Sequence, residues 1–124
     1  MSKYVALGLA GALGTISRYL LGGWVYQWLG AEFPYGTLAV NVTGCLVIGF
    51  LGTLADERSL LNPQIRLAAL LGFLGAFTTY SSFAYETWNL FKDGELFRAG
   101  GNLLATFVGC FSGLVLGVFA ARIL

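Results

Sequence analysis

Four stretches of the sequence are each long enough and apolar enough to cross a lipid bilayer as a helix. They cover about residues 4–29, 36–55, 64–91 and 97–123. A helix needs about 20 predominantly apolar residues to cross a hydrocarbon core of about 30 Å. Backbone amides and carbonyls in lipid must be paired within the protein, so such stretches fold as helices. The sequence predicts an all-α membrane protein with four transmembrane helices in one domain, residues 1–124.

Composition excludes several classes of function. Only 10% of residues are charged and 57% are hydrophobic, whereas soluble domains carry about 25% charged residues. The net charge of +1 provides no basic surface for nucleic acid. There is no histidine, so the usual general base and the commonest metal ligand are missing. We expect a protein of the cell (inner) membrane whose solvent is the lipid bilayer, and no enzyme.

The two cysteines, Cys45 and Cys110, lie in different apolar stretches and far apart in the sequence. No CxxC or Cys/His spacing of a metal site is present. We expect both to be small residues packed between helices.

The ends of the stretches carry interface and capping signals. Trp24 and Trp28 close the first stretch, as is typical of a membrane–water interface. Asn62 and Pro63 precede the third, where asparagine caps a helix and proline suits its first position.

An even number of spans places both termini on one side of the membrane. Basic residues on that side number four against two on the other, or three if Arg18 is counted there. The four are Lys3, Arg58, Arg66 and Arg122, and the two are Lys92 and Arg98. Such a weak bias under the positive-inside rule is compatible with insertion in both orientations.

The third stretch contains an unusual polar cluster. Thr78, Thr79, Ser81 and Ser82, with Tyr80 among them, follow two glycines near its middle. A continuous helix can hold these residues if the hydroxyls bond back to carbonyls one turn earlier. A broken helix would instead free carbonyls and amides to meet an ion. The spacing alone leaves both open.

Other polar residues fall on the second, third and fourth stretches. Asn41 can hold helices together or offer N–H donors to an anion. Asn102 and Thr106 lie one turn apart, which is typical of packing as well as of a pathway. Tyr80 and Phe83 share a face, and the positive edges of aromatic rings can face an anion.

Arg18 and Glu86 are charged residues well inside the first and third stretches. Each can be a helix-end group with a long apolar stem, or the two can neutralise one another. We expect Arg18 to be a structural ion-pair or vestibule residue, since a cation in a pore would hold an anion too tightly. Glu86 also allows an alternative function, a small proton-coupled multidrug exporter that uses an embedded carboxylate.

The fourth stretch carries a ladder of small residues, Gly109, Gly113 and Gly117. Such a ladder lets another backbone approach closely, either within the chain or in a dimer. Four thin helices have little material to enclose a polar pathway, so a transport function would need two subunits.

Three motifs together resemble the Fluc (CrcB-type) fluoride channel family. They are GALGTISR at Gly11–Arg18, GTLAVN at Gly36–Asn41 and GFLGAFTTYSSFAYET at Gly72–Thr87. The third motif is the most specific. Length and the four-span layout also agree, so the resemblance extends over essentially the whole chain.

The resemblance implies an antiparallel, dual-topology homodimer with two fluoride pores along the subunit interface and a third helix broken mid-membrane. Asn41, Tyr80 and Phe83 would line the pores. Carbonyls of Gly75 and Thr78 would hold a structural sodium ion at the dimer centre. Hydroxyls and a polar track would complete the pathway: Thr79, Ser81, Ser82, Asn102, Thr106 and Cys110. Such a channel lets fluoride leave the cell passively.

The sequence also departs from the family pattern. Tyr80 replaces the first of two phenylalanines, and Asn102 and Cys110 stand where hydroxyl residues are usual. These departures leave a second alternative, a non-conducting partner subunit of a heterodimeric channel.

Overall fold

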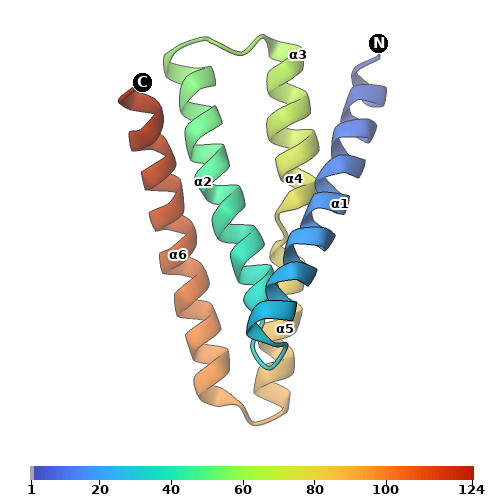
Figure 1. Ribbon diagram of the computed structural model, residues 1–124, viewed down its shortest axis with the longest axis vertical. Coiled ribbons are helices and arrows are strands. Elements are labelled where there is room, and N and C mark those ends of the chain that lie inside the picture. The colour runs from blue at the N-terminus through green and yellow to red at the C-terminus, as the bar shows by residue number, and fades with distance from the viewer. Residues whose placement is uncertain (1) are drawn as a thin grey trace.

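The computed structural model describes residues 2–124, and they form four helical spans that pass up and down through the molecule (Figure 1). Three spans are single helices: α1 (Lys3–Leu29), α2 (Tyr35–Glu57) and α6 (Leu96–Arg122). The remaining span, Pro63–Lys92, is built from four pieces. All four spans are long and apolar enough to cross a membrane. The predicted all-α architecture of four spans is confirmed, with ends within one or two residues of those expected.

The pieces of the third span follow one another closely. They are α3 (Pro63–Arg66), the wider π-helical segment η1 (Leu67–Leu74), α4 (Gly75–Phe77) and α5 (Tyr80–Lys92). The start is the predicted one, because Asn62 Oδ1 accepts the amide of Ile65 at 2.9 Å with Pro63 in the first helical turn. The π-helical turns have no signal in the sequence pattern.

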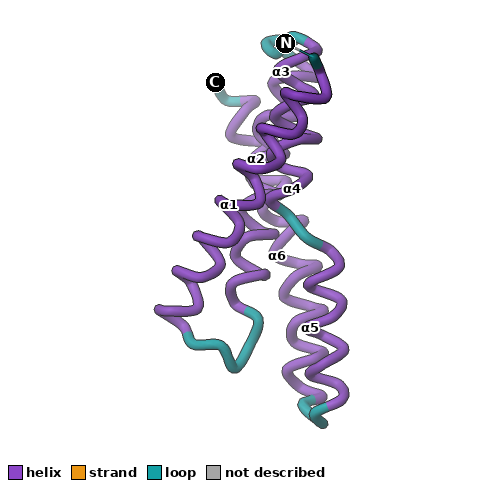
Figure 2. Tube along the Cα trace, turned by 90° about the vertical axis from the view of Figure 1, so that its right-hand side faces the viewer, coloured by secondary structure: helices purple, strands orange, loops and turns teal. Residues whose placement is uncertain are grey.

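Two extended residues interrupt the third span between α4 and α5. Thr78 has φ −87° and ψ 157°, and Thr79 has φ −149° and ψ 119°. Figure 2 shows this interruption as a loop in the middle of the molecule, with α5 running on from it to the far end. These angles are extended rather than helical, so the helix does not continue through the two residues.

Glycines allow α2 and α6 to pack with their backbones in contact. A Cβ added to Gly117 would strike the Leu46 carbonyl, and one added to Gly113 would lie 3.0 Å from the Val42 carbonyl. The glycine ladder of α6 therefore packs against α2 of the same chain. This contact within the chain explains the ladder, so a dimer contact is not required.

The first helix packs on the third span in the same way. A Cβ on Gly14 would meet the Phe73 carbonyl of η1. Val40 of α2 forms a buried apolar cluster with Leu74 and Phe77 of the third span, and Leu21 of α1 packs against it. Small residues at close helix crossings are the usual packing of helices in membranes.

Both termini lie at the same end of the molecule, as the even number of spans predicts (Figure 1). At that end Arg122 forms an ion pair with Glu57 at 2.6 Å, and Arg66 forms one with Asp56. At the other end Arg98 lies 3.5 Å from Glu32. These exposed pairs contribute little stability each, but they mark the two polar ends of the bundle.

Candidate functional site

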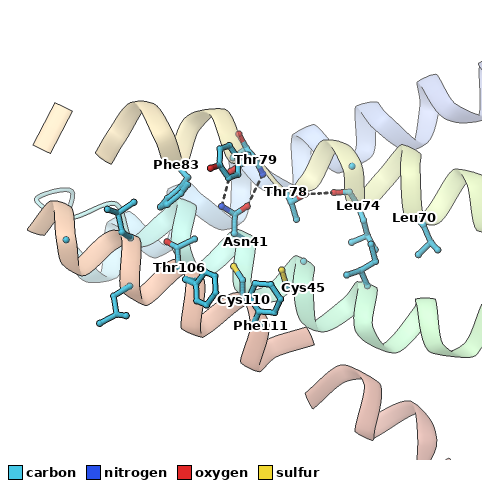
Figure 3. A pocket seen from close by; sticks show the side chains of 18 residues that line it. Asn41, Cys45, Leu70, Leu74, Thr78, Thr79, Phe83, Thr106, Cys110 and Phe111 are labelled. Atoms are coloured by element: carbon cyan, nitrogen blue, oxygen red, sulfur yellow. Dashed lines mark hydrogen bonds between the residues drawn. The ribbon is translucent and has the colours of Figure 1, made fainter. Parts of the chain in front are cut away.

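The interruption in the third span is held by one side chain from α2. Asn41 Oδ1 accepts the Thr79 amide at 2.8 Å, and Asn41 Nδ2 donates to the Thr79 carbonyl at 2.9 Å (Figure 3). The side-chain amide thus pairs with both backbone groups of one residue, as a neighbouring β-strand would. Asn41 is only 7% exposed. Because buried polar groups without partners are costly, this pairing stabilises a break that the helix alone would not keep.

The carbonyls of Gly75 and Thr78 are among those that the break leaves without their helical partners. In a continuous helix the Thr79 amide would pair with the Gly75 carbonyl, but it donates to Asn41 instead. The Ser82 amide would likewise pair with the Thr78 carbonyl, but it donates to Thr79 Oγ1 at 3.2 Å. Gly75 and Thr78 both line the larger cavity of the molecule. Two neutral oxygen acceptors are therefore available beside that cavity.

Hydroxyl groups gather where α5 begins. Thr79 caps the helix through its bond from the Ser82 amide, and its hydroxyl donates to Ser82 Oγ at 3.1 Å. Ser81 Oγ lies 3.5 Å from the same Thr79 oxygen. Three of the four predicted hydroxyls, those of Thr79, Ser81 and Ser82, are thus brought together at one helix start. The Thr78 hydroxyl instead bonds back to the Leu74 carbonyl, at 3.0 Å.

The larger cavity has a volume of about 840 Å³ and lies between α2, the third span and α6. Its wall is mostly apolar, with polar groups from Asn41, Thr78, Thr79 and Thr106 (Figure 3). Tyr80 also lines it and is 81% exposed. The break is therefore open to whatever covers this side of the chain.

Tyr80 and Phe83 form an edge-to-face aromatic pair at the cavity. Their ring centroids are 5.7 Å apart and their planes meet at 74°. In this arrangement one ring presents its electropositive edge and the other its face. Both rings line the cavity, so they lie on one face of α5, as their spacing predicted.

The polar stripe of α6 divides into a buried and a cavity-lining part. Asn102 is 1% exposed, and its Nδ2 donates to Thr87 Oγ1 at 2.8 Å. Its Oδ1 accepts the Thr106 hydroxyl at 3.4 Å. Thr106 lines the larger cavity, whereas Asn102 lines neither cavity. Asn102 therefore holds α5 to α6 and orients Thr106.

A second cavity, of about 550 Å³, lies between α1, the start of α2 and the start of α5. Figure 2 shows the α1–α2 connection diverging from α5 at this end. Arg18, half-buried, lines this cavity together with Thr37, Thr79 and Ser82. Thr79 lines both cavities, so the second cavity also reaches the hydroxyl cluster.

The suggested neutralisation of Arg18 by Glu86 is wrong within residues 2–124, since the ion pairs there do not join them. Glu86 instead accepts the Thr37 hydroxyl at 2.7 Å. The two charges come from elements that diverge, so their side chains find other neighbours.

Sequence reasoning missed two polar partners, Thr37 and Thr87. Thr37 precedes Asn41 by four residues, so the two share a face of α2, and this spacing was a signal that could have been used. Thr87 ends the GFLGAFTTYSSFAYET motif and points to α6, where it meets Asn102.

Comparisons with known proteins show the family to which this chain belongs. The family model described as "CrcB-like protein, Camphor Resistance (CrcB)" matches residues 5–118. The chain belongs to the CrcB family. It is 45% identical to a protein of Geobacter metallireducens over 122 residues, which is 98% of each chain. It is 46% identical to one from Geobacter sulfurreducens, again over 98% of each, and 43% identical to one from Geotalea uraniireducens over the full length of both. Each of these CrcB relatives is named "Fluoride-specific ion channel FluC".

Proposed function

We propose that this CrcB protein is a fluoride-selective ion channel of the cell (inner) membrane, through which fluoride leaves the cytoplasm passively. The names of full-length relatives support this function, and it is transport rather than catalysis. The observation that carries it in this chain is the Thr78–Thr79 break, held by Asn41 beside a cavity with aromatic edges and hydroxyls. The four apolar spans support a multi-pass membrane protein.

The functional unit is an antiparallel homodimer of two copies of this chain. One copy leaves the larger cavity open, with the polar groups of the break and the 81% exposed Tyr80 on its wall. A break near the middle of the bilayer requires protein on its open side. Unpaired backbone at that depth is tolerated only where protein buries it or where it lines a water-filled cavity. The weak Lys/Arg bias permits the two opposite orientations that such a dimer needs.

Two pores run along the interface of this dimer. In each, fluoride exchanges its water for donors met one at a time: the hydroxyls of Ser81 and Ser82, the free N–H of Asn41, and the ring edges of Tyr80 and Phe83. The hydroxyls of Thr79 and Thr106 join them by turning from Ser82 and Asn102, to which they donate in the absence of the ion. Weak sites in series let an ion enter and also leave. Asn102 contributes by holding Thr106 in place. A narrow route of this kind excludes chloride because chloride is larger.

Arg18 and Glu86 act at the mouth of the pathway rather than within it. Arg18 lines the second cavity with Thr79 and Ser82, so its charge raises the local concentration of anions near the hydroxyls. Glu86 is tied to Thr37, and this bond holds the start of α2 against α5.

A sodium ion at the dimer centre is a further part of the proposal, and the residues fit it. The carbonyls of Gly75 and Thr78 have lost their helical partners and border the open cavity. Unwound backbone carbonyls are the ligands that sodium finds in membrane proteins. Two copies supply four such oxygens. A bound sodium ion supplies positive charge that offsets the partial negative charge of these carbonyls.

We expect Gly75→Ala to weaken the dimer without unfolding the subunit. Within one chain the added methyl group meets only Leu70 and Leu71, at 4.0 Å, so the effect must arise between copies. The measurement is the dimer fraction of purified protein by size-exclusion chromatography with light scattering. Gly8→Ala, which meets nothing within 4 Å, is the control. Replacing sodium by N-methylglucamine should lower the dimer fraction of the unmodified protein, and a dimer equally stable without sodium would refute the metal site.

Tyr80→Phe should change throughput and leave selectivity intact. The substitution removes one hydroxyl and keeps the ring that pairs with Phe83. The measurement is fluoride and chloride efflux from liposomes containing each protein. Tyr85→Phe is the matched control, since Tyr85 is an exposed tyrosine of the same helix that lines neither cavity. A gain in chloride flux in Tyr80→Phe would contradict the role given to the ring.

Growth of bacteria tests the proposed function in cells. A strain that lacks its own fluoride exporter should grow on fluoride when it expresses this chain, because fluoride then leaves the cytoplasm. The same strain should not grow when it expresses Asn41→Asp at equal membrane levels. Absence of rescue by the unmodified chain, with protein in the membrane, would overturn the proposal for a channel made of this chain alone.

A further inference from the structure

The two cysteines, which are far apart in the sequence, lie together in the fold. Cys45 is on α2 and Cys110 is on α6, and both line the larger cavity. Figure 3 shows their side chains at the same part of the cavity wall. Both are free cysteines on helices that pack with their backbones in contact. The expectation that both pack between helices is therefore incomplete, because they also share one cavity wall.

The glycine contacts of α6 explain why the thiols meet. Gly109 and Gly113 flank Cys110, and added Cβ atoms there would lie 3.0 Å from Val42 Cγ2 and from the Val42 carbonyl. Backbones packed this closely place side chains of α2 and α6 beside one another at the cavity edge, and Cys45 and Cys110 are two of these.

The chemistry of the pair selects one class of ligand. Thiolates bind soft metal ions. Among residues 2–124 there is no group of three His, Cys, Asp or Glu side chains placed to hold a metal, so a four-coordinate zinc site has too few protein ligands. A metal ion that accepts two sulfur ligands in a line needs only the two thiols present.

We propose that Cys45 and Cys110 bind one soft, two-coordinate divalent metal ion of the Hg²⁺ type. Each thiol loses its proton to water, two metal–sulfur bonds form, and no electron is transferred. The product carries no net charge, because two thiolates balance the divalent ion. A neutral complex suits the apolar wall, where an unbalanced charge would be costly. The open cavity gives the ion access to both sulfur atoms.

The bound ion links α2 to α6 beside Asn41, which holds the break, and Thr106. The site does not depend on fluoride conduction. Its existence can therefore be tested by binding alone, and a negative result would leave the proposed channel function untouched.

The test uses the purified, folded full-length protein, titrated with Hg²⁺ and followed by native mass spectrometry. We expect one Hg²⁺ per chain that survives a wash with excess monothiol. In Cys45→Ser and in Cys110→Ser we expect the metal to be lost about 100-fold faster, because the second sulfur of a chelate acts at high effective concentration. Ser112→Ala, an exposed residue of α6 that lines neither cavity, should retain the metal like the unmodified chain.

Methylmercury provides a second test that needs no variant. It forms only one bond to sulfur, so the same wash should remove it from the unmodified protein while Hg²⁺ stays bound. Equal loss of Hg²⁺ and methylmercury would overturn the proposal. So would retention of Hg²⁺ by either single-serine variant, or Hg²⁺ found bridging two chains instead of two cysteines of one chain.

Discussion

Fluoride efflux should fall at least tenfold when Asn41 is replaced by aspartate. Aspartate can still accept the Thr79 amide, but it cannot donate to the Thr79 carbonyl, which Asn41 Nδ2 reaches at 2.9 Å. Loss of a buried partner costs about 1–3 kcal/mol, and a factor of ten corresponds to about 1.4 kcal/mol. The new carboxylate also repels an approaching anion. The measurement is efflux from liposomes, followed with a fluoride electrode, and the expected rate is one tenth of the unmodified rate or less.

Asn41→Leu separates the loss of the hydrogen bonds at the break from the effect of a new negative charge. Leucine holds neither backbone group of Thr79 and carries no charge. If holding the break matters, Asn41→Leu should conduct as poorly as Asn41→Asp. Thr53→Val is the control: Thr53 is buried on the same helix and donates only to the Gly49 carbonyl, at 2.7 Å. Full conduction by Asn41→Leu would show that the break does not depend on this side chain.

A methyl group at Gly49 should disrupt folding of the chain. The added Cβ would strike the Leu114 carbonyl of α6 and lie 3.0 Å from the Leu114 carbonyl carbon. Backbone cannot move aside as a flexible side chain can, and overpacking typically costs about 1–3 kcal/mol or more. We expect Gly49→Ala to lose most of the monodisperse protein in size-exclusion chromatography and to unfold at lower temperature.

Gly52→Ala is the matched control for this change. Gly52 lies on the same helix, three residues later, and a Cβ there meets nothing within 4 Å. Inside a helix, alanine is favoured over glycine by about 1 kcal/mol. The Gly52→Ala variant should therefore be at least as stable as the unmodified chain. Equal stability of Gly49→Ala and Gly52→Ala would contradict the close packing of α2 on α6.

The four spans could be predicted from the sequence because their length and apolar character are local properties. The helix start at Asn62–Pro63 is also local, since the cap is made within one turn. The polar cluster after Gly75 indicated an unusual segment, but spacing could not decide between a continuous and a broken helix. The structure has the break because a residue 38 positions away in the sequence, Asn41, pairs with Thr79.

Contacts between helices account for what could not be predicted. Helical periodicity tells which residues share a face, but not which helix that face meets. Gly109, Gly113 and Gly117 were compatible with a contact inside the chain or between chains, and packing against α2 decides for the former. The placement of Cys45 and Cys110 on one cavity wall depends on that same packing. The surroundings of Arg18 and Glu86 likewise depend on contacts between elements, as the bond from Thr37 to Glu86 shows.

The central claim is that this chain by itself forms a fluoride-selective pore. The most direct test is ion efflux from liposomes that contain only the purified protein, with fluoride and chloride followed in parallel by ion-selective electrodes. Rapid loss of fluoride with chloride retained is the predicted result. Retention of fluoride by liposomes that contain dimeric, folded protein, or equal loss of both ions, would contradict the account.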